Sequence, residues 1–164
     1  MDGITVGMRD SDGAGGIGLL ALARSVDEIV DALRESARPT IGCDGFCFVL
    51  RDGALCHYAA EDAVAPLWEG QRFPMEACVS GWAMRTGQLA IIPDIFEDDR
   101  VPHALYSQTF VRSMAMAPAG DPAVAALGAY WSRRGRPSSL SIELLRDLAA
   151  AAGDALARVR ALAE

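Results

Sequence analysis

The sequence predicts an α+β domain built around one antiparallel sheet, and three observations carry this prediction. Amphipathic helical patterns stand near the two ends of the chain, at residues 19–37 and 139–164. Two β-hairpin patterns lie between them, and short helical patterns separate the hairpins. Hairpins join neighbouring antiparallel strands directly, so this order of elements is typical of helices packed on an antiparallel sheet.

Length and composition indicate one folded unit. The chain has 164 residues, and 51% of them are hydrophobic, which is enough for one full core. We expect residues 19–164 to form a single domain. Gly and Asp dominate residues 10–16, so we expect residues 1–18 to be a flexible lead-in.

Charge and hydropathy exclude several kinds of partner. The formal net charge of −7 disfavours binding to nucleic acid or to an anionic membrane surface, because both require a concentrated positive field. The local cluster Arg133, Arg134 and Arg136 is interpreted as a solvated loop. The sequence shows no signal-peptide pattern and no apolar stretch of the roughly 20 residues that span a bilayer. We therefore expect a cytoplasmic protein.

The first helix is expected over residues 19–37, where apolar residues recur at spacings of three and four. Pro39 should end it, because the residue before a proline avoids the helical conformation. This helix should lie on the sheet. Its apolar positions are Leu19, Leu22, Val26, Ile29, Val30, Leu33 and Ala37.

The first hairpin is expected around Asp52 and Gly53, which suit the two central positions of a type I′ turn. This turn would pair Leu50 with Leu55, Val49 with Cys56 and Phe48 with His57. Both faces of the first strand are apolar, so we expect the sheet to be covered on both sides. His57 is interpreted as a packed core residue, with a pocket-facing orientation as the alternative.

Shorter elements fill the middle of the chain. Gly87 should end one short helix at its C′ position. The expected order is a loop or short helix at 61–71, an extended segment at 72–75, a helix at 78–87, a strand at 89–94, an acidic loop at 95–100 and a second short helix or structured loop at 103–113.

The last part of the chain predicts a second hairpin and a long helix. Strands at 113–118 and 123–131 should be joined by a turn at 120–122, and Ser138 or Ser139 should cap the helix. Two overlapping apolar stripes make this helix's apolar face too wide for a sheet contact alone, and its alanines allow close helix approach. We therefore expect a homodimer through this helix. The stripes comprise Ile142, Leu145, Leu148, Ala149, Ala152, Ala155, Leu156, Val159 and Leu162.

Four segments, in this order, resemble the GAF domain family. The segments are Val79-Ser80-Gly81-Trp82-Ala83-Met84-Arg85-Thr86-Gly87, Ile91-Ile92-Pro93-Asp94-Ile95, Phe110-Val111-Arg112-Ser113-Met114 and Leu127-Gly128-Ala129-Tyr130-Trp131. The likeness covers residues 19–164 and is greatest to GAF modules at the N-terminus of bacterial sensor histidine kinases, including the HWE type. It implies five or six antiparallel strands, terminal helices on one face, and a lid of small helices and loops over a ligand pocket on the other.

The family binds cyclic nucleotides, bilins, haem or amino acids, or has no known ligand, so the fold leaves the ligand open. Cyclic-nucleotide binders carry an Asn-Lys-x-x-Asp-Glu set, whereas this chain has neither Asn nor Lys. Bilin binders use a Cys directly before a His in the lid, where this chain has Pro102 before His103. Cys56 does precede His57, but in the second strand, where the family's thioether is not found.

The four cysteines show neither CxxC pairing nor the density of a disulfide scaffold, so we expect reduced thiols. Cys43 and Cys47 lack further Cys or His neighbours and are interpreted as small buried side chains, not as metal ligands. The resemblance also admits a thiol enzyme of the free methionine sulfoxide reductase kind. The cysteine of that branch would fall near Ser80, two positions from Cys78, so this alternative stays open.

We therefore expect a sensory domain of bacterial signal transduction, not an enzyme, that binds an unknown small ligand and needs no metal or cofactor. A downstream kinase or other output domain is the expected partner. The alternatives are the thiol redox enzyme or sensor, and a purely structural dimerisation module without a ligand.

The expected ligand site combines apolar walls with a few polar anchors, as small-molecule sites commonly do. Asp94 is the first choice for a polar anchor, with a helix cap or turn as its alternative role. His103 is either a ligand donor or a solvated loop residue, and the aromatic candidates can equally close the core. The candidates are Phe73, Trp82, Asp94, Phe96, His103, Tyr106, Phe110 and Met116.

Overall fold

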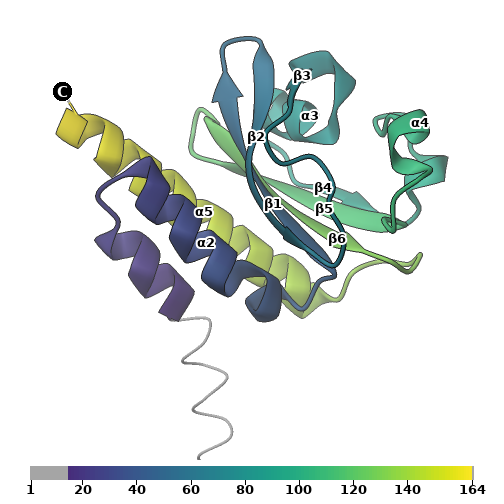
Figure 1. Ribbon diagram of the computed structural model, residues 1–164, viewed down its shortest axis with the longest axis horizontal. Helices are drawn as coiled ribbons and strands as arrows, with labels where there is room; N and C mark the ends of the chain where they lie inside the picture. Colours follow the sequence, from purple (N-terminus) through teal and green to yellow (C-terminus); the bar gives the residue numbers. More distant parts are fainter. Residues whose placement is uncertain (1–14, 164) are drawn as a thin grey trace, which may run out of the picture.

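The computed structural model describes residues 15–163 and is centred on a six-stranded antiparallel sheet with the order β3-β2-β1-β6-β5-β4 (Figure 1). The predicted α+β class is confirmed. The strands are β1 (Gly45–Asp52), β2 (Leu55–Ala63), β3 (Arg72–Pro74), β4 (Ala90–Ile92), β5 (Ser113–Ala119) and β6 (Ala125–Trp131). The helices are one over residues 15–22, α2 (Val26–Ile41), α3 (Val79–Thr86), α4 (His103–Tyr106) and α5 (Ser139–Ala163), with 3-10 turns η1 (Met75–Ala77) and η2 (Ile95–Glu97).

Both faces of the sheet are covered, as predicted. Helices α2 and α5 pack on one face, and α3 and α4 lie on the other (Figure 1). Side chains of β1 alternate between the two sides: Phe46 and Phe48 join the core under the terminal helices, whereas Cys47 and Val49 join the opposite core. We call α3, α4, the two 3-10 turns and the loop 64–71 the lid.

The single helix predicted at residues 19–37 is wrong, because the structure breaks it in two. Residues 23–25 separate the helix 15–22 from α2, and Ser25 Oγ accepts a hydrogen bond from the backbone N–H of Glu28 at 3.1 Å. Serine is a favourable N-cap, so it starts α2 at the next residue. The apolar spacing runs through the break and therefore conceals it.

Helix α2 also continues past Pro39 to Ile41, where a stop before the proline was predicted. A proline this close to the end removes only one of the last backbone hydrogen bonds. Ala37 and Ile41 remain buried on either side of it. The helix ends instead at Gly42, which has a left-handed φ of 76°.

The predicted lead-in over residues 1–18 falls mostly outside the described residues, which begin at residue 15. Residues 15–18 are helical, in contrast to the expected flexibility. Leu20 of this helix is fully buried, and Arg158 of α5 donates to its carbonyl at 2.7 Å. These contacts attach the helix 15–22 to α5, and the boundaries of the domain stay a prediction.

The first hairpin forms where expected, but the predicted strand pairing is wrong by two residues. Leu50 lies opposite His57 rather than Leu55, and Val49 lies opposite Tyr58. The turn is centred on Gly53 and Ala54; Gly53 has a φ of 60°, and no other type of residue in the described chain has a positive φ. This suits a turn with glycine at its first central position. Because this shift is even, the side chains between the turn and Val49 stay on the same faces as in the predicted pairing.

A bulge between Phe48 and Val49 changes the register further along the hairpin. Phe48 therefore pairs with Ala60, and not with His57 as predicted. His57 is half-buried and lies close to the turn of the hairpin.

Helix α5 begins as predicted, since Ser138 Oγ accepts from the N–H of Ser141 at 3.1 Å. Its wide apolar face, however, is covered within the chain by the sheet, by α2 and by the helix 15–22. The buried residues are Leu145, Leu148, Ala149, Ala152, Ala155, Leu156 and Val159. Of the predicted stripes, Leu162 is 67% exposed. The width of the face is therefore no evidence for a partner.

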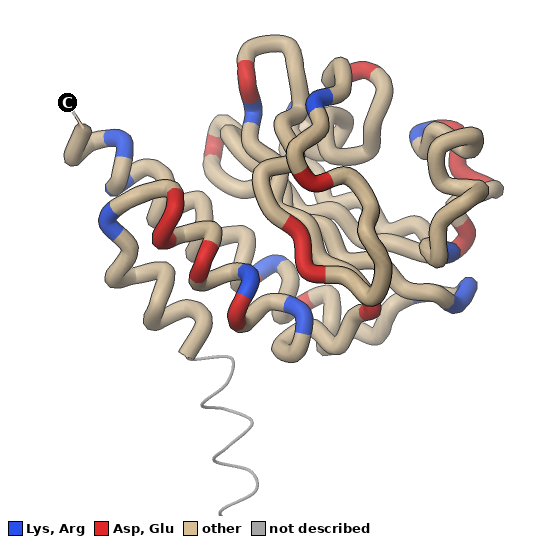
Figure 2. Tube along the Cα trace, in the orientation of Figure 1, with Lys and Arg blue, Asp and Glu red and all other residues tan. Residues whose placement is uncertain are grey.

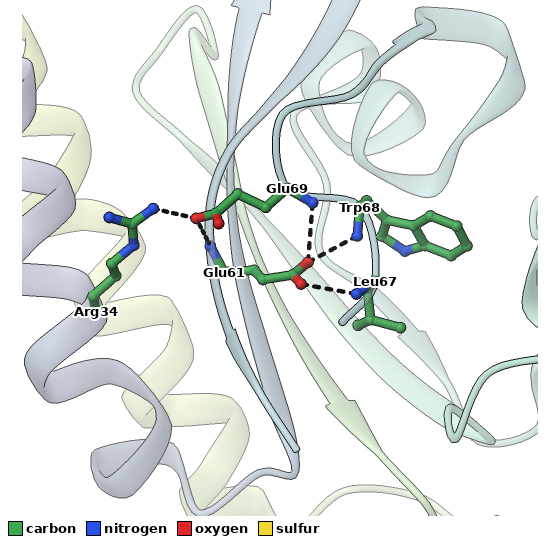
Figure 3. Close-up of polar contacts among 5 residues, drawn as sticks. All are labelled: Arg34, Glu61, Leu67, Trp68 and Glu69. Carbon is green, nitrogen blue, oxygen red and sulfur yellow. Dashed lines mark hydrogen bonds and ion pairs between the residues drawn. The ribbon is translucent and has the colours of Figure 1, made fainter. Parts of the chain in front are cut away.

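The Glu61 carboxylate fixes the loop 64–71 over the sheet (Figure 3). It accepts hydrogen bonds from three successive backbone N–H groups, those of Leu67 and Trp68 at 2.8 Å and that of Glu69 at 3.2 Å. Hydrogen bonds to an ionised acceptor are stronger than neutral ones. The side chain of Glu69 in turn accepts from the N–H of Glu61 and pairs with Arg34 of α2. Trp68 is thereby held in place from its backbone.

Gly81 lets α3 approach η1 at backbone distance. A Cβ atom at this position would lie 1.9 Å from the carbonyl oxygen of Met75, so no other residue fits without moving the two segments apart. This contact fixes the first turn of α3 against the preceding turn. None of the described helices is long and apolar enough to cross a membrane.

Replacing Glu61 by Gln should lower the free energy of unfolding by about 1–3 kcal/mol. Both carboxylate oxygens of Glu61 accept backbone N–H groups, whereas one terminal atom of a glutamine amide is an NH2 group that cannot accept. Urea denaturation measures this change. Asp62→Asn is the matched control, since Asp62 makes a partly exposed ion pair with Arg38 at 3.4 Å and should change stability by less than about 1 kcal/mol. Equal effects of the two substitutions would contradict a special role for Glu61.

Gly81→Ala should destabilise the fold by about 3 kcal/mol, because its methyl group meets backbone atoms that cannot rotate away. Gly18→Ala, in the helix 15–22 and with nothing within 4 Å of the added methyl, should instead raise stability by up to about 1 kcal/mol. Thermal unfolding of both variants distinguishes close approach from helix propensity. A stable Gly81→Ala protein would show that η1 and α3 are not held together here.

Candidate functional site

A small cavity of about 70 Å³ lies between strands β2 and β3 and the lid. Its wall is mostly apolar. We call it the aromatic cavity, and its lining residues are Tyr58, Trp68, Phe73, Ala77, Cys78, Pro102, Leu105 and Tyr106.

Edge-to-face contacts hold the aromatic walls together. Ring centroids lie 5.5 Å apart for Tyr58 and Phe73, 6.0 Å for Trp68 and Phe73, and 5.1 Å for Trp68 and Tyr106. Such pairs are favoured by the quadrupoles of the rings. The cavity is therefore preformed, with its walls fixed by one another.

Trp68, one of the lining residues, carries a buried hydrogen-bond donor. The residue is 8% exposed, and its indole N–H makes no well-formed hydrogen bond among the described residues, although it is near enough to the Tyr106 hydroxyl to oppose the rise that burial causes in the pKa of Tyr106. Leaving a buried donor unsatisfied costs about 1–3 kcal/mol, so such groups are uncommon in native cores. An acceptor that enters the cavity from outside would remove this cost.

Cys78 is the polar element of the wall and the N-cap of α3. Ser80 Oγ donates to its sulfur at 3.2 Å, and because this uses the only hydroxyl proton of Ser80, Tyr58 OH donates to Ser80 at 3.1 Å. The pKa of Cys78 is lowered to about 6, first by a hydrogen bond from Cys56 and then by Ser80 and the N–H of Gly81, against the opposing effect of burial. The Cys78 thiol also donates to the carbonyl oxygen of Pro74 at 3.6 Å.

The other three cysteines are held as thiols. The hydrogen bond to Cys78 and burial raise the pKa of Cys56. Burial raises the pKa of Cys43 and of Cys47 to about 12. Of the four cysteines, Cys78 is the one whose surroundings lower the pKa of the thiol.

The structure brings two of the eight predicted ligand residues, Phe73 and Tyr106, to the aromatic cavity. Trp82 lies elsewhere on the lid, with the guanidinium of Arg100 4.3 Å from its ring centroid. Phe110 packs against Gly45, and Met116 is fully buried in β5 beside Gly128. These three side chains close the core or the lid surface.

The predicted polar anchors also lie outside the cavity. Asp94 caps η2, accepting from the N–H of Phe96 at 3.0 Å, and it pairs with Arg134 at 3.7 Å. His103 Nε2 lies 2.9 Å from the carbonyl oxygen of Asp98, and the ring of His103 packs on Phe96. The capping role, given as the alternative for Asp94, is the one that the structure displays.

Sequence reasoning considered Trp68 among the aromatic residues that could line a cavity or close the core, and it did not place Tyr58 at a site. Trp68 lies in a segment predicted only as a loop or short helix, and Tyr58 in a predicted strand. A tryptophan in an otherwise polar loop was the available signal, because a large aromatic side chain there must find a surface to cover. Cys78 was identified only for the thiol alternative.

A larger hollow of about 730 Å³ lies on another side of the molecule, between the end of α3, the β5–β6 turn and α5. It is open to solvent, and its polar lining includes Arg85, Asp121, Arg146 and Asp154. It has no converging aromatic walls. The aromatic cavity is therefore the better candidate despite its smaller size.

Charged residues are interspersed over the described chain, and Figure 2 shows acidic and basic segments alternating along α2 and around the lid. Several form local pairs, such as Arg100 with Asp98 at 2.7 Å and Arg72 with Asp52 at 3.0 Å. The polar surface around the cavity is thus built from neighbouring opposite charges.

Comparison with solved structures shows the same fold in proteins of low identity. The GAF domain of an Acinetobacter phosphoenolpyruvate-protein phosphotransferase has a TM-score of 0.79 at 12% identity, covering 95% of this chain and 97% of that chain. Free methionine-R-sulfoxide reductase from Neisseria meningitidis, solved with its substrate, has a TM-score of 0.79 at 16% identity, covering 96% and 93%. The GAF domain of a two-component sensor histidine kinase from Bacillus halodurans has a TM-score of 0.72 at 15% identity, covering 87% and 100%.

A search of curated protein sequences finds no match to this chain. The model of the GAF domain family matches residues 23–157, which is most of the sequence. The narrower resemblance to HWE-type kinases stays a prediction. With the matching sheet order, terminal helices and lid, the family match establishes that the chain belongs to the GAF domain family.

Proposed function

We propose that this chain is a non-enzymatic regulatory GAF domain of a cytoplasmic bacterial signalling protein and binds a compact ligand in the aromatic cavity. The observation that carries the proposal is an enclosed aromatic wall with one unsatisfied buried donor, the indole N–H of Trp68. An apolar wall with one polar group is the usual composition of a small-molecule site.

The size of the cavity defines the class of ligand. Sites for drug-sized molecules are commonly about 300–1,000 Å³, whereas this cavity measures about 70 Å³. A nucleotide or tetrapyrrole does not fit. The proposed ligand has only a few non-hydrogen atoms, an apolar body and one hydrogen-bond acceptor for Trp68.

The loop that carries Trp68 offers a path from the ligand to a terminal helix. Glu69 follows Trp68 directly and pairs with Arg34 on α2 (Figure 3). Both side chains are more than 40% exposed, so the pair contributes little to stability. The pair nevertheless links the loop to α2, so a movement of the loop would change it. Binding at Trp68 would move this loop relative to α2. An output domain such as a kinase would respond to the resulting change in the position of α2.

We further propose that the domain forms a homodimer, through the exposed end of its helical layer and not through the buried face of α5. Arg158 of α5 donates to the carbonyls of Leu20 and Ala23, so Leu22 and Leu162 lie within one helical turn of the same point. They are 76% and 67% exposed. Exposed leucines this close together provide an apolar centre for a contact between two copies.

Titration with dimethyl sulfoxide tests the ligand site, because this molecule has two methyl groups and one strong acceptor. The indole N–H signal of Trp68 in a nitrogen–proton correlation spectrum should shift saturably, with a Kd of roughly millimolar order for so few atoms. Trp68→Phe should abolish the binding by removing the donor. Trp82→Phe is the control and should leave it unchanged, since Trp82 is outside the cavity.

Shifts of equal size at all three tryptophans, or unchanged binding by Trp68→Phe, would reject the site. A purely structural domain would show no saturable shift with dimethyl sulfoxide or with a small amide such as N-methylacetamide.

Sedimentation velocity at micromolar concentration tests the dimer. Leu22→Glu and Leu162→Glu should each shift the protein to monomer, because a charge at the centre of an apolar contact is left unpaired. Val64→Glu is the control, since Val64 is 56% exposed but lies on the lid loop. A monomeric wild-type protein would refute the dimer and leave the ligand proposal intact.

A further inference from the structure

The larger hollow, of about 730 Å³, lies where three parts of the fold meet. The last turn of α3 forms one wall, the middle of α5 forms another, and the β5–β6 turn lies between them. Because α3 and α5 pack on opposite faces of the sheet, residues from both helical layers line the hollow (Figure 1). Its volume is within the range of about 300–1,000 Å³ that is usual for sites of drug-sized molecules.

The most buried residues that line this hollow are apolar. Ala117 of β5 and Ala149 of α5 are each 2% exposed, and Leu89 and Pro118 are half-buried. None of them carries a polar side chain. The deeper part of the hollow therefore suits the apolar body of a ligand.

Four exposed charged side chains, two of each sign, surround this apolar part: Arg85, Arg146, Asp121 and Asp154. None of the four forms an ion pair within residues 15–163. Hydrogen bonds between ionised groups are stronger than neutral ones, so a ligand that carries one charge of each sign could pair with both kinds of side chain.

A close backbone contact holds the two carboxylates at one end of the hollow. Gly153 comes directly before Asp154, and Gly120 comes directly before Asp121. A Cβ atom at position 153 would lie 2.6 Å from the backbone nitrogen of Gly120, so α5 and the β5–β6 turn touch at backbone distance. This end of the hollow therefore has a negative potential that favours a cationic group.

Arg146 provides a positive charge at a distance from the two carboxylates. It lies about two helical turns before Asp154 on the same side of α5, with Ala150 between them. Eight residues of helix span about 12 Å. Side chains on a helix lean toward its N-terminus, and Arg146 also borders the surface around Ser139 at the start of α5. A ligand that pairs with both ends must therefore be extended.

We propose that the larger hollow binds a short peptide with free termini. Its amino group lies between Asp121 and Asp154, its carboxylate pairs with Arg146, and Arg85 adds a positive charge from the α3 wall. Three extended residues span roughly 10 Å, which matches the separation of the two ends. A bound peptide would contact α3 and α5 together and so link the lid to a terminal helix.

The arrangement of the charges disfavours other classes of ligand. The amino and carboxylate groups of a single amino acid are joined to one carbon atom, so they cannot reach both ends. A polyanion such as a nucleotide would meet Asp121 and Asp154, and a polycation would meet the two arginines. The hollow shares no lining residue with the aromatic cavity, so this inference does not depend on the ligand proposed there.

Titration of the protein with the tripeptide Ala-Leu-Ala, followed in nitrogen–proton correlation spectra, tests the proposal. The backbone signals of Gly120 and Ala150 should shift saturably, with a Kd below about 1 mM. Acetylating the amino group or amidating the carboxylate of the peptide should each weaken binding about tenfold or more, because each change removes one charge. Absence of saturable shifts at roughly ten times that concentration, or equal binding of the blocked peptides, overturns the proposal.

Substitutions test which end of the hollow holds which terminus. Asp154→Asn should weaken binding of the free tripeptide about tenfold but should not further weaken the acetylated one, and Arg146→Gln should behave in the same way toward the amidated one. Asp147→Asn and Arg160→Gln are the controls and should bind as the wild type does, since these exposed residues of α5 do not line the hollow.

Equal weakening of the free and blocked peptides by Asp154→Asn and Arg146→Gln, or equal weakening by the controls, would overturn the assignment of the termini. The indole signal of Trp68 should stay unchanged with the tripeptide, because Trp68 lines only the aromatic cavity. A shift of that signal instead of those of Gly120 and Ala150 would place the peptide in the aromatic cavity and reject the second site.

Discussion

The rest of the structure depends on the pairing of β1 with β6, two strands from opposite halves of the chain that are buried on both faces. Gly45 to Leu50 pair with Ala125 to Tyr130 without interruption. Close packing across this pair requires a residue without a side chain at Gly128, where a Cβ would lie 2.7 Å from both the sulfur of Cys47 and the terminal methyl of Met116. Alternation along these strands divides the interior into two cores, one under the terminal helices and one under the lid.

The lid does not form a core of its own and is held to the sheet by a few specific contacts. Glu61 captures the loop of Trp68 through three backbone N–H groups, and Gly81 brings α3 against η1. The aromatic cavity is the space left where these two attachments meet. Its small volume is therefore a consequence of backbone positions, and its selectivity for compact molecules follows from them.

One hydrogen-bond chain gives the cavity its chemistry. The Tyr58 hydroxyl donates to Ser80 Oγ, and Ser80 Oγ donates to the sulfur of Cys78. These buried hydroxyl groups keep this part of the wall polar in an otherwise apolar cavity. The wall of the cavity thus carries two polar groups in different places, the indole N–H of Trp68 and the sulfur of Cys78.

The sequence by itself determined the features that local patterns encode: the order of the elements, the caps at Gly87 and Ser138, the two-sided burial of β1 and the family. It also identified Phe73 and Tyr106 among the residues at the cavity. Only the tertiary structure decided the break before α2, the register of the first hairpin and the burial of the α5 face within the chain. It alone joined Glu61 to the Trp68 loop and Tyr58 to Ser80, because such contacts depend on strand register and chain reversal, which a one-dimensional pattern does not contain.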